Sequence, residues 1–176
     1  MSARKDRRLA RFERAVSENS PALLTYFARR TDPTFDAADL LADTLLTLWK
    51  KAHVLPAADE EIRPWMFGIA RNVLLHHRRS AARRHALADR LRSQLSAEPT
   101  AGFADSDAFD ELHDALSSLD QIDQEIITLL HWDGLSLNEI ARALGLKDGT
   151  IRSRYHRART RLRGQLTDAE YVGDGR

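Results

Sequence analysis

The stretch that decides the fold is residues 136–163, which read SLNEIARALGLKDGTIRSRYHRARTRLR. Ser136, followed by Glu139 three residues later, forms a capping box, which is a pattern that starts an α-helix. Gly145 stands where that helix would end, because glycine tolerates the left-handed backbone conformation found there. Asp148 is then placed to cap a second helix. This order of signals predicts a helix-turn-helix.

The second helix of this pair has two chemically different sides. Its apolar residues recur at helical spacing and therefore share one face: Ile151, Tyr155, Ala158 and Leu162. The opposite side carries small polar and basic residues: Ser153, His156, Arg157 and Thr160, flanked by Arg152 and Arg163. A helix of this kind suits the major groove of DNA. The alternative interpretation is a solvated basic face on an unrelated helical bundle.

The charged residues of this 176-residue chain are segregated, although its net charge is only +1. Residues 71–92 contain seven arginines and one acid, and residues 147–163 contain seven lysines or arginines and one acid. Between these two basic segments, residues 93–125 contain nine acids and no lysine or arginine. The pattern favours two DNA contacts joined by a linker that DNA repels.

Composition excludes several classes of protein. The chain has no cysteine, so it has no disulfide framework and no thiolate for zinc binding or catalysis. No apolar run approaches the roughly 20 residues that span a bilayer, and the charged N-terminus lacks the apolar stretch of a signal peptide. We therefore expect a cytoplasmic protein without membrane insertion.

Catalytic and metal sites are not predicted either. His76, His77 and His85 do not match the common zinc spacings, and the neighbouring arginines would repel a cation. The sequence contains no recognisable nucleophile–base pair, phosphate-binding glycine loop or paired-carboxylate site. We expect no metal, no cofactor and no enzymatic activity.

The rest of the chain predicts helices only, because no segment alternates convincingly between apolar and polar residues. Four helices are expected before residue 85: residues 7–18, Ser20-Pro21 to about residue 30, Asp36 or Asp39 to about residue 52, and Pro64 to about residue 84. Two more precede the helix-turn-helix: one with the stripe Leu112, Leu116 and Leu119, and one that starts at Asp120 or Asp123 and ends at Gly134.

These elements predict an all-α fold of two small helical domains. The first domain spans residues 8–84, and the second, residues 109–166, contains the helix-turn-helix. Residues 85–108 are expected to form a flexible acidic linker, since residues 93–108 are small, polar and acidic.

Three stretches, in this order, resemble the extracytoplasmic-function (ECF) sigma factors, the smallest class of the housekeeping-sigma family. DLLADTLLTLWKK (39–51) resembles the family's helix that binds the clamp coiled coil of the polymerase largest subunit. IRPWMFGIARNVLLHHRR (62–79) resembles its promoter-melting segment and downstream-element helix, and residues 135–163 resemble its reader of the upstream element. Ala42 and Leu45 stand where the family usually has glutamine and phenylalanine.

The resemblance implies an RNA polymerase sigma factor that directs promoter-specific initiation, with core RNA polymerase, promoter DNA and an anti-sigma factor as partners. Its polymerase-binding helix carries Asp39 and Asp43, which lie four residues apart on one face, beside three apolar candidates: Leu40, Leu48 and Trp49. A buried apolar stripe with solvated acids explains the leucines equally well, so the prediction depends on the two acids. The candidates for the downstream element are Trp65, Arg71, Asn72, Arg78 and Arg79. Trp65 is either a core residue or a platform for an unpaired base, and Asn72 is either a DNA contact or a buried amide.

The second helix of the helix-turn-helix is expected to recognise the upstream promoter element. Base contacts are expected from the residues near its start: Arg152, Ser153, His156 and Arg157. Phosphate contacts are expected from Lys147, Arg159, Arg161 and Arg163. Two rival functions remain: a stand-alone helix-turn-helix repressor or activator, which predicts dimers on palindromic sites, and an adaptor whose basic helices bind an acidic protein.

Overall fold

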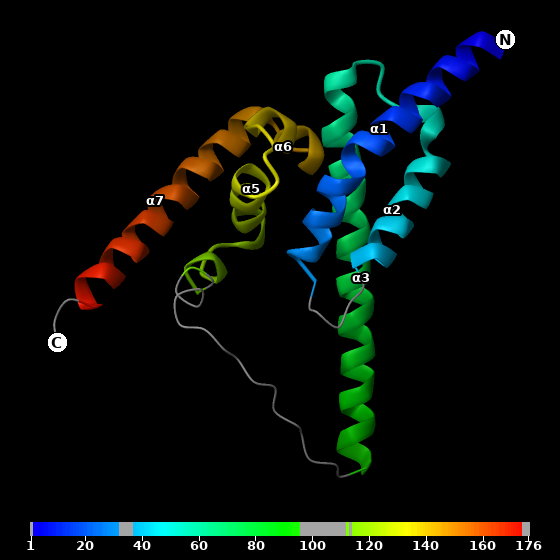
Figure 1. The fold of residues 1–176 in the computed structure, drawn as a ribbon. Helices are drawn as coiled ribbons and strands as arrows, with labels where there is room; N and C mark the ends of the chain where they lie inside the picture. The colour runs from blue at the N-terminus through cyan, green and yellow to red at the C-terminus, as the bar shows by residue number, and fades with distance from the viewer. Residues whose placement is uncertain (1, 32–36, 96–111, 113, 174–176) are drawn as a thin grey trace. The chain divides into compact units, whose positions relative to one another are not determined.

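A computed structural model describes residues 2–31, 37–95, 112 and 114–173 of the chain (Figure 1). Those residues form helices and connecting turns, and no strand occurs among them. The chain divides into two compact units, Met1–Ala101 and Gly102–Arg176. The expected all-α fold with two helical units is confirmed, whereas the residue boundaries of the predicted domains stay a prediction.

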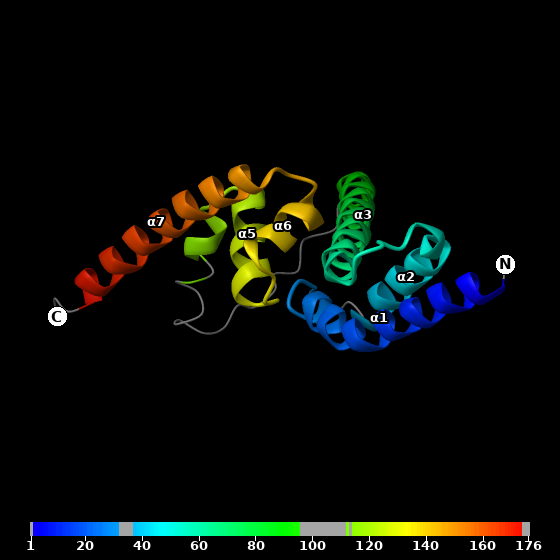
Figure 2. The same cartoon turned by 90° about the horizontal axis from the view of Figure 1, so that it is seen from above.

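Unit 1 is built from three helices: α1 (Ser2–Ala28), α2 (Ala37–Lys50) and α3 (Asp59–Leu95), with a 3-10 helix at Ala52–Val54. Each of α1, α2 and α3 packs against the other two, and Figure 2 views α3 nearly along its axis. The core is formed by large apolar side chains from all three helices: Phe12, Leu23, Tyr26, Phe27, Leu40, Leu48, Met66, Phe67 and Leu74. At its centre the Tyr26 and Phe67 rings meet edge to face, with their centroids 5.7 Å apart.

The N-terminal segment is one helix, not the two that we predicted. We expected a break at Ser20-Pro21, but α1 continues through Pro21 to Ala28. The Ser20 hydroxyl donates to the Val16 carbonyl at 2.6 Å instead of capping a new helix. One buried stripe runs through the proline: Phe12, Ala15, Leu23, Tyr26 and Phe27. Burial of this stripe outweighs the single backbone hydrogen bond that proline cannot make.

The long helix of unit 1 starts earlier and ends later than predicted. We expected Pro64 to open it, but α3 begins at Asp59, and its first turn contains Asp59, Glu60 and Glu61, which lie between the third and fourth helices expected from the sequence. Acidic side chains stabilise a helix N-terminus because they oppose its positive dipole end. α3 also continues to Leu95, so residues 85–95 of the predicted linker are helical. None of the described α3 side chains after Leu74 is buried. This C-terminal half of α3 extends beyond α1 and α2 in Figure 1.

Arg11 joins α1 to the beginning of α3. Its guanidinium donates to Asp59 Oδ1 at 2.6 and 3.0 Å and to the carbonyls of Pro56 and Ala57 at 3.1 and 2.9 Å. These hydrogen bonds and the positive charge of Arg11 hold the pKa of the Asp59 carboxyl below its ordinary value. The contact fixes where α3 starts relative to α1.

Unit 2 contains a helical turn at residues 114–117 and three helices, α5 (Gln121–His131), α6 (Leu137–Leu144) and α7 (Asp148–Gly173). α5 begins at the first of the two expected positions, because the Asp120 side chain accepts from the Asp123 backbone N–H at 3.1 Å. The Ser136–Glu139 capping box at the start of α6 is confirmed, with both reciprocal hydrogen bonds present. Gly145 ends α6 in the left-handed conformation, as predicted.

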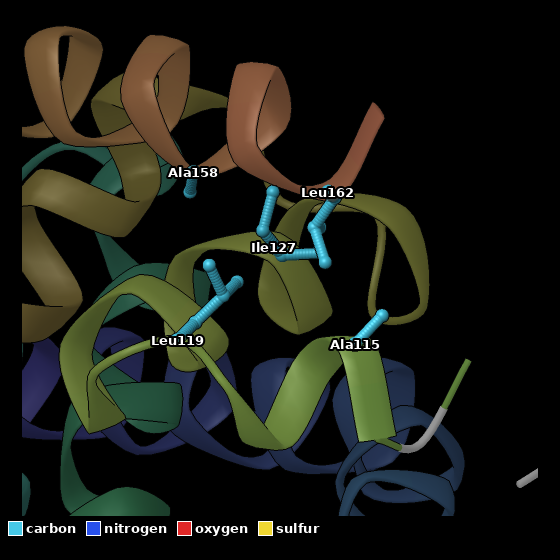
Figure 3. Packing of buried hydrophobic residues seen from close by; sticks show 5 residues of the cluster. All are labelled: Ala115, Leu119, Ile127, Ala158 and Leu162. Carbon is cyan, nitrogen blue, oxygen red and sulfur yellow. The ribbon is translucent and has the colours of Figure 1, made fainter. Parts of the chain in front are cut away.

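The core of unit 2 joins α7 to α5 and to the preceding turn. Figure 3 shows the packing of Ala115, Leu119, Ile127, Ala158 and Leu162. The apolar stripe expected on α7 is confirmed, since Ile151, Ala158 and Leu162 are buried and Tyr155 packs against the cluster. The stripe expected for the preceding helix is wrong at Leu112, which is 40% exposed, and Ala115 lies in the core instead.

Replacing Gly145 with alanine should destabilise the helix-turn-helix by about 1–2 kcal/mol, because a Cβ is strained in the left-handed region. The φ of Gly145 is +67°, and nothing lies within 4 Å of the position of an added Cβ, so the loss reports backbone strain alone. Gly164 is the matched control: it is helical and equally uncrowded, so Gly164→Ala should stabilise by about 0.5–1 kcal/mol. Urea unfolding measures both, and a Gly145→Ala protein as stable as the parent would contradict the prediction.

Candidate nucleic-acid interface

All eight side chains of α7 and its preceding turn that we predicted to contact DNA are exposed: Lys147, Arg152, Ser153, His156, Arg157, Arg159, Arg161 and Arg163. The opposite side of the helix is buried through Ile151, Ala158 and Leu162. The buried stripe anchors α7 to the unit while the basic and polar side chains remain accessible. This is the arrangement that a recognition helix needs, because its outer face must enter the major groove.

The turn between α6 and α7 differs from the prediction by one residue. We expected Asp148 to cap α7, but Asp148 is its first helical residue. The carbonyl of the preceding residue, Lys147, accepts from the backbone N–H groups of Thr150 and Ile151 at 2.9 and 3.1 Å. Asp148 therefore opposes the positive dipole end of α7 from within its first turn.

Arg152 lies beside the first helix of the pair. Its Nη2 donates to the Asn138 Oδ1 atom of α6 at 3.2 Å, and both side chains are exposed. An exposed hydrogen bond of this kind contributes little to stability. It nevertheless holds the Arg152 guanidinium near the junction of the two helices, at the end of α7 where we expect base contacts.

Arg154 belongs to the basic segment but faces α5. Its Nη1 donates to Asp123 Oδ1 at 2.7 Å and to both Asp120 oxygens at 3.0 and 3.2 Å. The two carboxylates raise the pKa of Arg154, whereas hydrogen bonds from the Asp123 backbone and from Arg154 lower that of Asp120. Sequence analysis missed this contact. The only signal for it in the sequence is that two acids begin one helix and an arginine-rich helix follows about thirty residues later.

The candidates on α3 occupy different environments. Trp65 and Arg71 are half-buried, while Asn72, Arg78 and Arg79 are exposed. Asn72 is exposed, which contradicts the buried-amide interpretation. The other interpretation, a contact with DNA, stays a prediction. Arg78 also has a partner within unit 1, because its Nη2 donates to the Arg30 carbonyl at 3.1 Å.

A groove of 530 Å³ lies between α2 and α3. Its walls combine apolar, acidic and basic side chains, among them Asp43, Leu46, Lys50, Asn72, His76 and Arg84. Asn72 and Asp43, which we predicted as contacts of DNA and polymerase respectively, thus line the same groove.

The residues predicted on α2 divide into exposed and buried side chains. Asp39 and Asp43 are exposed, but Leu40 is only 4% exposed and Leu48 is fully buried. These two leucines belong to the core of unit 1, as the buried-stripe alternative predicts. The accessible apolar residues of α2 are Leu46 and Trp49, which are 58% and 60% exposed. Trp49 packs one side against the Phe12 ring, at a centroid distance of 5.8 Å.

The described residues lack the features of two other kinds of site. They contain no group of three or more histidine, cysteine or acidic residues placed to hold a metal ion. Among the same residues, no helix has the length and apolar character needed to cross a membrane.

Two family models match the chain. The model of Sigma-70 region 2 matches residues 15–84, and that of Sigma-70, region 4, matches residues 109–162. The ECF RNA polymerase sigma factor SigL of Mycobacterium tuberculosis is 32% identical over 153 residues, which cover 86% of each chain. The RNA polymerase sigma-E factor of Streptomyces coelicolor is 30% identical over 159 residues, covering 88% of this chain and 85% of the relative.

Solved structures show the same similarity. The sigma factor RpoE of Bartonella quintana, crystallised with the anti-sigma factor NepR, matches with a TM-score of 0.64 and 27% identity. That match covers 89% of this chain and 96% of the other. CnrH, solved in complex with the cytosolic domain of CnrY, matches with a TM-score of 0.59 and 26% identity over 90% of this chain and 88% of the other.

Proposed function

This chain belongs to the ECF sigma factors, and we propose that it engages core RNA polymerase through the exposed surface of α2 and reads the upstream promoter element through α7. It is an RNA polymerase sigma factor that directs promoter-specific transcription initiation. The stand-alone regulator is not favoured. It would account for the helix-turn-helix but not for the match to Sigma-70 region 2 at residues 15–84.

The observation that carries the upstream assignment is the division of α7 into two faces. Its described core residues are buried in unit 2, while all the predicted base-contacting and phosphate-contacting residues are exposed. We place base reading on Arg152, Ser153, His156 and Arg157 and phosphate binding on Lys147, Arg159, Arg161 and Arg163.

In unit 1, we assign polymerase binding to exposed residues of α2 and not to its buried leucines. The polymerase contact is assigned to Asp39 and Asp43 together with Leu46 and Trp49, all of which are accessible. The downstream element is assigned to Trp65, Arg71, Asn72, Arg78 and Arg79. The exposed half of α3, past Leu74, supports the assignment of Arg78 and Arg79, because a helix that presents arginines to solvent suits a phosphate backbone.

Reconstitution with core polymerase tests the proposed function directly. With the chain added, we expect transcription from a defined set of start sites when fragmented genomic DNA is the template. The chain alone is expected to bind promoter duplexes weakly, because polymerase must hold both DNA contacts at promoter spacing to raise their effective concentration. Tight, sequence-specific duplex binding by the isolated chain, together with no effect on polymerase, would instead identify the repressor or activator.

We also propose an anti-sigma factor as a regulatory partner. RpoE was crystallised with the anti-sigma factor NepR, and CnrH was solved in complex with the cytosolic domain of CnrY. Since the chain acts with polymerase, its place of action is the cytoplasm, and we assign it no catalytic activity of its own. Purification from unstressed native cells should recover a stoichiometric second protein. Recovery with polymerase alone would contradict the inhibitor and indicate control by synthesis.

A further inference from the structure

The recognition helix α7 is held on both flanks of its buried stripe. Arg152 and Arg154 are two residues apart, which places them about 200° apart around a helix of 3.6 residues per turn. Arg152 reaches Asn138 of α6 at 3.2 Å on one flank. Arg154 reaches Asp120 and Asp123 of α5 on the other. A rotation of α7 about its own axis would therefore break one contact or the other.

The contact of Arg154 is the more constrained of the two. One guanidinium nitrogen approaches three carboxylate oxygens within 3.2 Å. The side chains of Arg154 and Asp123 are only 26% and 17% exposed. Asp120 also caps α5, so the contact joins α7 to the first turn of α5. Charge-assisted hydrogen bonds are shorter and stronger than neutral ones, so these contacts hold the Arg154 side chain against α5.

We propose that Arg154 is a positioning residue that sets the orientation in which α7 presents Ser153, His156 and Arg157 to the promoter. This inference rests on the proposed function of α7. Arg154 follows Ser153 directly and lies one turn before Arg157, so a shift of its backbone moves both of these residues. Recognition of bases tolerates only small backbone shifts, since functional side chains must be held within about 0.5 Å and 10–20° of their working geometry.

A simpler role for Arg154 makes the opposite prediction. If Arg154 were one more phosphate contact, partly masked by the two acids, releasing it would strengthen binding to every DNA sequence. Asp123→Asn is the decisive variant, because it removes one negative charge without touching the side chain that caps α5. Electrostatics alone predicts tighter binding by this variant. Loss of positioning predicts weaker discrimination between promoter sequences.

The experiment uses holoenzyme reconstituted from core polymerase and the full chain, with templates that carry the cognate upstream element or single-base variants of it. Discrimination is on the order of 10-fold per mismatched base pair in a specific complex. We expect Arg154→Ala and Asp123→Asn each to reduce it by at least about threefold, and Arg154→Lys to restore part of it. The dependence of binding on salt should stay unchanged in Arg154→Ala, because no phosphate contact is lost.

Arg159→Ala is the matched control, since Arg159 is an exposed arginine of the same helix. It should weaken binding to all templates alike and lower the salt dependence by about one phosphate contact. All measurements are made well below the unfolding midpoint of each variant, determined by circular dichroism.

The outcomes separate this inference from the proposed function. Uniformly tighter binding by Asp123→Asn with unchanged discrimination would overturn the positioning role and make Arg154 a masked phosphate contact. Unchanged discrimination in Arg154→Ala would overturn it as well. If the parent holoenzyme itself showed no preference among the upstream variants, the assignment of α7 as the upstream reader would be the part that fails.

Discussion

Reversing the charges of Asp39 and Asp43 is expected to abolish binding of core RNA polymerase, with a loss of affinity on the order of 100-fold or more. Both carboxylates are exposed on α2, and within the described residues neither forms an ion pair. Exposed carboxylates of this kind can meet cations on a partner. Arginine at both positions would place like charges across the interface, and such contacts cost several kcal/mol. Titration of labelled chain with core polymerase measures the effect.

Two comparisons make this result specific to the surface. Asp43→Arg alone tests it without disturbing the first turn of α2, where Asp39 opposes the helix dipole. The double variant Glu13→Arg with Glu18→Arg changes the net charge equally on the exposed side of α1. We expect it to bind polymerase like the parent chain. Equal binding by the parent and the Asp39→Arg, Asp43→Arg chain would remove α2 from the polymerase interface.

Substitution of Arg157 is expected to relax promoter choice at one upstream position. Arg157 is exposed on the outer face of α7, directly before the buried Ala158. Loss of a base-contacting arginine costs about 1–3 kcal/mol for the cognate base and little for the others, so the preference at that position flattens. Transcription from a library of upstream elements, randomised one position at a time, shows which position is affected.

Arg161→Ala provides the contrast on the same helix. Arg161 is also exposed, but it lies one turn farther from the start of α7, where we assign phosphate contacts. Its loss should weaken binding to all templates alike and reduce the salt dependence of binding by about one phosphate contact. An unaltered sequence preference in both Arg157→Ala and Arg152→Ala would show that the outer face of α7 is oriented differently from our assignment.

The helix-turn-helix was predictable from the sequence because its signals are local. A capping box spans four residues, and the left-handed Gly145 reports a backbone conformation that few other residues adopt. The apolar stripe of α7 was predictable for a related reason, since helical periodicity alone determines which side chains share a face. The family resemblance rested on this segment together with residues 39–51 and 62–79, and the matches to Sigma-70 regions 2 and 4 confirm it.

The errors occurred where a local signal competed with packing. Pro21 and Pro64 are strong helix-start signals, yet both lie inside helices. At Pro21 the deciding factor is the buried stripe that continues from Phe12 to Phe27, and at Pro64 it is an acidic first turn with Ile62 and Pro64 in the core. Only the other two helices of unit 1 make that burial favourable, so no window of sequence could have revealed it.

From the sequence alone, the all-helical fold, the helix-turn-helix and the sigma-factor family followed, because each depends on residues close together in the chain. Tertiary structure decided which side chains of those helices remain available to partners. It buried Leu40 and Leu48 and left Leu46 and Trp49 exposed on α2, and it paired Arg154 with Asp120 and Asp123 across more than thirty residues of chain. Exposure and long-range charge pairing depend on the helices that pack beside a residue, and helical periodicity does not specify those neighbours.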